Sequence, residues 1–230
     1  MTLDEPLIEA AFIRRLNRFA AEVDIDGRIG AAHLANPGRM KELLVPGTRC
    51  RVRKAANPNR KLPYDFVMIK YGRVNVSLQS FLANDLVAEA LAGRKIPSLS
   101  QWSVTRREVT YGRSRVDFLL GNHRNEEMTL EVKSCTYVIK RHGFFPDAPT
   151  TRGARHVREA IHRVKNGGKA GILFCVQRAD CDVVSPNAET DPDFTAALRD
   201  AHKAGVFMSA VRCLVSPKRI VVSDEIPVAP

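Results

Sequence analysis

Two charged segments decide the fold that we expect for this chain: Arg115-Val116-Asp117-Phe118-Leu119-Leu120 and Thr129-Leu130-Glu131-Val132-Lys133-Ser134. Each segment has the apolar content of a β-strand with a buried face. Side chains two residues apart in a strand point to the same face, so Glu131 and Lys133 should lie on one side of a sheet. A hairpin between the two segments would bring Asp117 beside Glu131.

This arrangement predicts a divalent-cation site. Two carboxylates at close range repel each other unless a cation lies between them, and their hard oxygen ligands suit Mg²⁺ or Mn²⁺. We expect Asp117 and Glu131 as metal ligands, with Glu89 on the preceding helix as a further carboxylate. The metal would polarise a phosphodiester and lower the pKa of a bound water, while Lys133 would orient that water or steady developing charge.

The D…ExK arrangement of these residues resembles the core of the PD-(D/E)xK nucleases, in which Asp117, Glu131 and Lys133 would be the catalytic residues. A short pattern of this kind also arises from charges on an exposed strand face. The order of the surrounding elements favours the nuclease-like interpretation, because a helix precedes the hairpin and a basic helix follows it.

Outward from the hairpin, the second part of the chain alternates between helices and strands. We expect helices at 81–91, 154–166 and 192–204, and strands at 101–110, 114–120, 128–134, 170–176 and 206–215. Leu82, Leu86 and Ala90 form one apolar stripe of the first helix, and Gly93 marks its end. This alternation predicts an α/β domain around a mixed sheet, which we assign to residues 81–230.

The first part of the chain, residues 1–80, reads as short strands separated by turn signals. Turns are expected at Asp26-Gly27 and at Asn36-Pro37-Gly38, with a short helical piece over 40–44. The run 12–25 reads as strand, and further strands are expected at 48–54 and up to Val76. About five strands with one short helix fit a small closed barrel of the OB type.

The chain carries a formal net charge of +11 at pH 7, which favours a polyanionic partner. An uninvolved basic surface is the alternative. Arg49, Arg51 and Arg53 alternate with Cys50 and Val52, so they form a basic stripe on one strand face. With Arg39 they are candidate nucleic-acid ligands in the barrel, where such a surface tracks a phosphate backbone.

A second basic surface is expected on the helix near residues 154–166. Its apolar residues share one face, and Arg155 and Arg158 lie opposite. Arg152 and the start of the helix suit a phosphate, because unpaired N–H groups and the helix dipole both favour anions. We include His156 among the candidate nucleic-acid ligands. An ordinary amphipathic surface helix would show the same pattern.

Cellular location follows from what the sequence lacks. The five cysteines are scattered and have no CxxC or metal-ligand spacing, which is typical of reduced thiols in the cytosol. The first residues are acidic and mixed rather than basic and then apolar, unlike a signal peptide. No apolar run approaches the roughly 18 residues of a membrane helix. We expect a soluble, cytoplasmic protein without a membrane partner.

Five segments, in matching order, together resemble the sugar fermentation stimulation protein family (SfsA). They are His33-Leu34-Ala35-Asn36-Pro37-Gly38-Arg39-Met40, the helix from Asn84 to Glu89-Ala90-Leu91, Gly112-Arg113-Ser114-Arg115-Val116-Asp117-Phe118, Glu131-Val132-Lys133-Ser134, and Phe145-Pro146-Asp147-Ala148 with Arg152-Gly153 and His156. The resemblance implies an OB-like barrel followed by a restriction-endonuclease-like α/β domain, and DNA binding. The family name reflects an effect on sugar metabolism of the maltose type, which implies regulation.

Three functions remain open on the sequence. The first is a DNA-binding protein with a metal-dependent phosphodiesterase site, that is, a Mg²⁺-dependent endonuclease. The second is a non-catalytic DNA-binding regulator with a vestigial acidic site, because nuclease-like folds also bind DNA without cutting it. The third is an RNA-binding or RNA-processing protein, because OB barrels often accept RNA.

Overall fold

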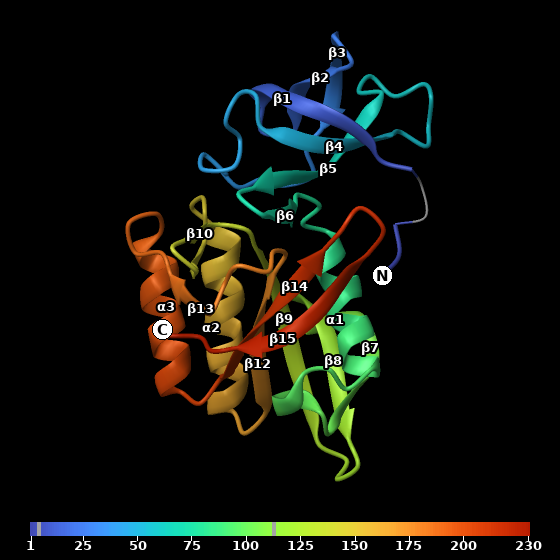
Figure 1. The fold of residues 1–230 in the computed structure, drawn as a ribbon. Coiled ribbons are helices and arrows are strands. Elements are labelled where there is room, and N and C mark those ends of the chain that lie inside the picture. Colours follow the sequence, from blue (N-terminus) through green and yellow to red (C-terminus); the bar gives the residue numbers. More distant parts are fainter. Residues whose placement is uncertain (4–5, 112–113) are drawn as a thin grey trace.

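A computed structural model describes residues 1–3, 6–111 and 114–230. A β-barrel lies at one end of a larger α/β body, and the chain passes from one to the other just before helix α1 (Figure 1). Gly112 and Arg113, which belong to one of the five family-like segments, lie outside the described residues. No helix within the described ranges is long and apolar enough to cross a membrane.

The barrel is a closed ring of five strands. Four antiparallel pairs (β1–β2, β2–β3, β1–β4 and β4–β5) and the parallel pair β3–β5 complete the ring, and β6 extends it from β5. The expected OB-like barrel is therefore confirmed. Its strands are β1 (Ile8–Asn17), β2 (Ala20–Ile25), β3 (Arg28–His33), β4 (Arg49–Lys54), β5 (Tyr64–Tyr71) and β6 (Val74–Ser77).

Two local expectations for the barrel are wrong. The run 12–25 is not continuous, because a turn at Arg18-Phe19 separates β1 from β2. The segment 40–44 forms turns rather than a helix. Met40 has a positive φ of 49°, which a right-handed helix does not accept, and its N–H bonds to the side chain of Asp147 at 2.6 Å. A contact with the second body therefore overrides the local helical preference.

The second body contains a six-stranded mixed sheet in the order β15-β14-β12-β9-β8-β7, with β12 parallel to both β9 and β14. A smaller sheet has the order β10-β11-β13. The elements are α1 (Leu82–Ala92), the 3₁₀ turn η1 (Pro97–Leu99), β7 (Trp102–Tyr111), β8 (Ser114–Asn122), β9 (Glu127–Cys135), β10 (Val138–Ile139), β11 (His142–Phe145), α2 (Thr151–Lys165), β12 (Lys169–Val176), β13 (Val183–Pro186), α3 (Pro192–Lys203), β14 (Phe207–Val215) and β15 (Ile220–Ile226).

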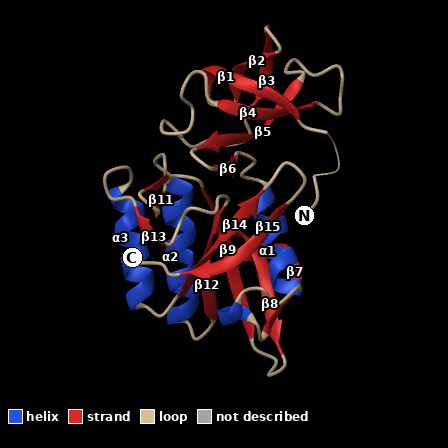
Figure 2. Cartoon of the chain, viewed as in Figure 1, coloured by secondary structure: helices blue, strands red, loops and turns tan. Residues whose placement is uncertain are grey.

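Helices cover both faces of the large sheet (Figure 2). Strand β12 shows how the sequence makes this possible, because its successive residues point to opposite faces. Leu173 and Cys175 belong to the core that includes α1, whereas Ile172 and Phe174 belong to the core of α2 and α3. A strand buried on both faces reads as a continuous apolar run. The expected α/β architecture of this part is confirmed.

Strand β15 is the clearest element that the sequence analysis missed, because the last expected strand ended at residue 215. Its apolar pattern is interrupted by the polar residues Ser223, Asp224 and Glu225. Charges of this kind are common on an edge strand, and β15 lies at the edge of the sheet. The chain start also packs here. The N–H of Leu3 donates to the carbonyl of Lys218 at 2.8 Å, so residues 1–3 contact the second body rather than the barrel.

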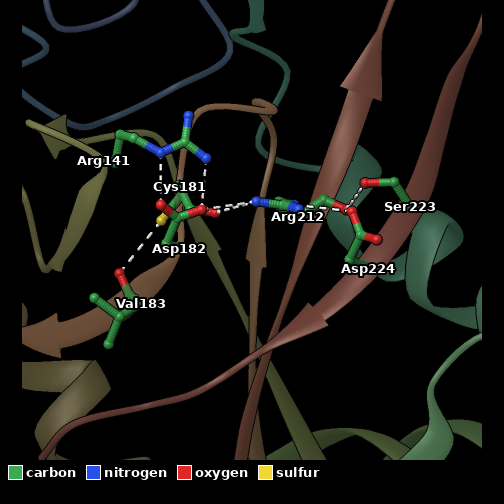
Figure 3. Close-up of polar contacts among 7 residues, drawn as sticks. All are labelled: Arg141, Cys181, Asp182, Val183, Arg212, Ser223 and Asp224. Carbon is green, nitrogen blue, oxygen red and sulfur yellow. Dashed lines mark hydrogen bonds and ion pairs between the residues drawn. The ribbon is translucent and has the colours of Figure 1, made fainter.

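A network of ion pairs fixes the β10–β11 turn to strand β14 (Figure 3). Asp182 accepts two hydrogen bonds from Arg141, at 2.5 and 2.6 Å, and one from Arg212, at 2.9 Å. Arg212 also donates to Asp224 at 2.9 Å. Both carboxylates are about half exposed, so solvent screens these pairs and each contributes little to stability. We assign the network a structural role, because it holds the hairpin that leads into the loop 146–150, here called the Asp147 loop.

Glu42, near the junction of the two bodies, destabilises the folded protein when its carboxylate is ionised. Both of its carboxylate oxygens are buried, without a hydrogen-bond partner among the described residues. Burial raises the pKa of Glu42 to about 7, and the nearby charge of Asp147 adds to the effect. The folded protein therefore holds this proton more tightly than the unfolded chain does. Stability should fall as the pH rises from about 4.5 to about 7, and stay low above that.

We predict that Glu42→Gln raises the free energy of unfolding at pH 8 by about 1–3 kcal/mol and changes it little at pH 5, because the amide carries no charge at either pH. Urea unfolding at the two pH values measures this difference. Glu127→Gln, at an exposed position of β9, is the matched control and should show no pH-dependent gain. Equal destabilisation of Glu42→Gln at both pH values would contradict the assignment.

Candidate active site

The site is built where the β8–β9 ladder ends. The last antiparallel pair on that side is Phe118 with Leu130, so Asp117 and Glu131 occupy the next positions on the two strands. Oδ2 of Asp117 accepts a hydrogen bond from the backbone N–H of Val132 at 2.7 Å. The hairpin predicted from the sequence thus brings the two carboxylates together.

Helix α1 also holds Asp117. Nδ2 of Asn84 donates a hydrogen bond to Oδ1 of Asp117 at 2.8 Å. With the Val132 N–H on the other oxygen, each carboxylate oxygen has one donor. The orientation of the Asp117 carboxylate is therefore set by a helix and by a neighbouring strand, and each of its oxygens keeps acceptor capacity for a further group.

Glu131 lies on β9 beside Ile172 of the parallel strand β12, and only 9% of its surface is exposed. Its Oε1 accepts hydrogen bonds from Nζ of Lys133, at 2.7 Å, and from Nδ1 of His156 on α2. Its Oε2 is buried and has no partner among the described residues. A buried, unpaired carboxylate oxygen is costly, so this atom is a candidate ligand for a cation.

His156 connects Glu131 to an exposed arginine. Nε of Arg152 donates to Nε2 of His156 at 3.4 Å. Arginine has no acceptor, so Nε2 accepts and the ring proton lies on Nδ1, which donates to Glu131. Helix α2 is fixed at its start by Thr150, whose side chain accepts the N–H of Gly153 at 3.0 Å. His156 is 7% exposed, so it lies beneath the surface at which we expected it to meet nucleic acid.

The two carboxylates differ in their electrostatic surroundings. Burial raises the pKa of Asp117, and the neighbouring charge of Glu131 raises it further. Burial also acts to raise the pKa of Glu131. Hydrogen bonds from His156 and Lys133, with the charge of Lys133, outweigh that effect and hold the pKa below its ordinary value. Glu131 is thus the more readily ionised of the two, and a cation would stabilise the charged form of both.

The donor set fits a hard divalent cation. The part of the chain that the structure describes contains no group of three or more His, Cys, Asp or Glu side chains arranged to hold a metal. Two carboxylates with an unpaired oxygen remain. Mg²⁺ is commonly bound by one or two carboxylates, with waters and substrate phosphates completing its shell. The site therefore suits an ion that is coordinated partly by the protein and partly by the oxygens of a phosphate.

Glu89 is not brought to this site. It is exposed and forms an ion pair with the amino group of Met1 at 2.5 Å. Five residues along a helix correspond to about 140° of rotation, so Glu89 and Asn84 point in different directions from α1. Asn84 is the residue that the sequence reasoning missed. Its place beside the buried stripe of α1 was the available signal, but an amide is not the carboxylate that a metal site suggests.

The predicted basic residues lie in two places, the barrel and helix α2, and some of those in the barrel are paired with acidic residues. Arg49, Arg51 and Arg53 alternate with buried residues as expected, but Arg51 pairs with Glu9 at 2.5 Å and Arg53 with Asp65 at 3.4 Å. Their net charge is thereby reduced. The exposed Arg39 precedes Met40, whose N–H bonds to the Asp147 loop.

The helix arginines also face different ways. Arg152 contacts His156 and so borders the acidic pair. Nε of Arg155 lies 4.0 Å from Oε1 of Glu159, and Arg158 forms an ion pair with Asp193 of α3. Six residues along a helix turn Arg158 about 120° away from Arg152. Of the three, Arg152 is therefore the one placed to meet a ligand of the acidic site.

Comparison with known proteins supplies the family. One family model, the SfsA N-terminal OB domain, matches residues 13–78, and a second, the sugar fermentation stimulation protein RE domain, matches residues 81–219. The chain is 44% identical to a sugar fermentation stimulation protein homolog of Acetivibrio thermocellus, with 99% of each chain covered, and 40% identical to one of Alkaliphilus metalliredigens, with 96% of each covered.

A solved structure, that of Pyrococcus furiosus SfsA in complex with Ca²⁺, is similar over the full length. It has a TM-score of 0.88 and 28% sequence identity, and 100% of both chains is covered. The expected fold class, an OB-like barrel followed by a restriction-endonuclease-like α/β domain, is confirmed. On sequence and structure alike, this chain belongs to the sugar fermentation stimulation protein family.

Proposed function

We propose that this protein binds DNA and cleaves its phosphodiester backbone at a divalent-metal site of the PD-(D/E)xK type. The observation that carries the proposal is the buried, unpartnered Oε2 of Glu131 beside the carboxylate of Asp117. Such an arrangement is costly in the protein alone and favourable around a cation. The Ca²⁺ complex of the related Pyrococcus furiosus protein supports a divalent cation in the family.

Each residue has a distinct role in this proposal. Asp117 and Glu131 would hold Mg²⁺ or Mn²⁺, which supplies charge neutralisation at the phosphate and a bound water of lowered pKa. Lys133, on the same strand face as Glu131, orients the attacking water or steadies charge on the phosphate. Asn84 and His156 are positioning residues, because each contacts one of the two carboxylates and none of the reacting atoms.

The proposed DNA path crosses the junction of the two bodies. Arg152 borders the acidic pair, and Arg39 lies on the barrel loop that meets the second body. The stripe of Arg49, Arg51 and Arg53 would extend the path over the barrel. The net charge of +11 supports a polyanionic ligand, because each neutralised phosphate releases condensed counterions.

One observation favours a second function, a DNA-binding regulator without catalysis, consistent with a role in sugar metabolism. Oε1 of Glu131 already accepts hydrogen bonds from Lys133 and His156, so half of this carboxylate is satisfied without a metal. A nuclease-like fold does not by itself establish cleavage. The metal and cleavage experiments below separate the two functions.

We predict that Mn²⁺ or Mg²⁺ raises the unfolding temperature of the protein, and that Asp117→Asn or Glu131→Gln abolishes the increase, because a ligand stabilises the state that binds it. Asn84→Ala should weaken metal affinity about 10- to 100-fold through the freed Asp117. Thermal unfolding across a metal titration measures both effects. Glu89→Gln is the matched control and should behave as the wild type. If Glu89→Gln lost as much of the metal-induced rise in unfolding temperature as Asp117→Asn does, the assignment of ligands would be contradicted.

We predict slow, Mg²⁺- or Mn²⁺-dependent cleavage of DNA. Ca²⁺ should bind without supporting cleavage, because its looser coordination positions the water poorly. Asp117→Asn and Glu131→Gln should abolish cleavage and leave DNA affinity unchanged or slightly higher. Lys133→Ala should reduce cleavage strongly and metal affinity much less. Nicking of a plasmid gives the rate. Equal trace activity in wild type and in an identically prepared Glu131→Gln would indicate contamination and support the regulator instead.

We predict that DNA affinity falls steeply with salt, and that Arg39→Gln with Arg152→Gln reduces the log–log slope by about two, roughly one for each lost phosphate contact. The triple change of Arg49, Arg51 and Arg53 to Gln should flatten the slope as well. Binding of a labelled duplex across a salt series measures it. Arg158→Gln, which loses only a surface pair with Asp193, is the control. An unchanged slope in the triple variant would remove the barrel from the footprint.

A further inference from the structure

A small pocket lies where the barrel meets the segment that leads into α1. Its volume is about 210 Å³, and its lining includes His33, Arg53, Arg60, Asp65, Gln79 and Phe81. Sites for drug-sized ligands occupy roughly 300–1,000 Å³, so this pocket suits a single small ring system. It is separate from the acidic pair, and none of the roles proposed above explains its composition.

Gln79 lines the pocket and carries a buried side-chain acceptor without a partner in the described part of the chain. The residue is 2% exposed, and its main chain is fixed because the carbonyl accepts a bond from Nε2 of Gln177 at 3.0 Å. Its side-chain Oε1 is buried and has no partner among the described residues. A buried amide oxygen is normally satisfied, so a ligand that donates an N–H at this position would remove an existing cost.

Basic residues form another part of the lining, around one carboxylate. Asp65, with a side chain that is 15% exposed, lies 2.8 Å from Arg60, 3.4 Å from Arg53 and 3.7 Å from His33. One carboxylate therefore gathers two permanent cations and a histidine. The carboxylate holds these groups in place, and guanidinium groups at the rim are the donors that suit a phosphate group.

Phe81 supplies an aromatic surface at the pocket. Its side chain is 58% exposed, although Leu82 beside it is buried in the core. An exposed phenylalanine next to a polar pocket is well suited to stack on a nucleobase, because every base offers a flat aromatic face. Phe81 immediately precedes α1, and Asn84, which holds Asp117, follows three residues later. That separation is about 5 Å along a helix axis.

We propose that this pocket binds one unpaired nucleotide of the DNA strand that reaches the acidic site. The base stacks on Phe81, an amino group on its hydrogen-bonding edge donates to Oε1 of Gln79, and the adjoining phosphate lies against Arg60 and Arg53. The assignment rests on the proposed function and refines it. The preferred substrate then contains a single-stranded or displaced nucleotide next to the bond that is cut.

The test measures binding of the full-length protein to labelled strands of about 12 nucleotides in EDTA, so that no strand is cut. The strands carry adenine, unsubstituted purine or an abasic residue at every position. Phe81→Ala should weaken binding of the adenine strand about 5- to 100-fold and leave the abasic strand unchanged. Gln79→Met should remove a preference of about 2- to 10-fold for adenine over purine, since purine lacks the donated amino group.

Ile29→Ala is the control, because Ile29 is a more exposed apolar residue (71%) of the barrel that does not line this pocket. It should bind all strands as the wild type does, and the unfolding midpoint of each variant confirms its fold. The nucleotide pocket is overturned if the wild type binds the adenine and the abasic strands and Phe81→Ala weakens binding of these two strands equally or not at all. That result leaves the proposed function standing. Failure of the wild type to bind any strand or duplex overturns both.

Discussion

The hydrogen bond from the N–H of Val132 to the carboxylate of Asp117 is the interaction on which the acidic site depends. It takes up a backbone donor at the end of the β8–β9 ladder, and in doing so it fixes one carboxylate beside another. Burial and the charge of Glu131 both oppose this arrangement, and both raise the pKa of Asp117. A fold that retains such a cost at a fixed position is consistent with a cation as the missing partner.

The same region joins the two bodies of the protein. Nε2 of Gln177, at the end of β12, donates both to the carbonyl of Gln79 and to the hydroxyl of Ser134, each at 3.0 Å. Ser134 follows the site lysine on β9, and Gln79 precedes α1. One side chain therefore links the strand that carries Glu131 to the segment that carries the small pocket. This linkage ties the segment between the barrel and α1 to the strand that carries the acidic pair.

The sequence was informative wherever a local pattern determines structure. Alternation in β4 and the apolar stripe of α1 predicted which residues are buried, and the hairpin spacing predicted the meeting of Asp117 and Glu131. Long-range contacts were less accessible. The bond from Met40 to Asp147 replaces an expected helix, and the neighbours of Glu131 include a histidine 25 residues away.

The chemical type of the site residues limited the prediction as much as their separation in the sequence did. A carboxylate is the residue type that a metal site suggests, which pointed to Glu89 on α1, although helix geometry turns Glu89 toward Met1. Asn84 is uncharged, so its signal was its place beside the buried stripe of α1 rather than a pattern of charges. Likewise the unpaired oxygens of Glu131, Gln79 and Glu42 are properties of packing, because whether a polar atom finds a partner depends on segments that are distant in the sequence.

A crystal structure grown with Mn²⁺ tests the central claim most directly, because the ion can be located by its anomalous scattering. The account predicts a peak between the carboxylates of Asp117 and Glu131, roughly 2.0–2.3 Å from an oxygen of each, and predicts that the peak is absent from Asp117→Asn crystals grown in the same way. Full occupancy of Mn²⁺ elsewhere in the molecule, with Oε2 of Glu131 still unpaired, would contradict it.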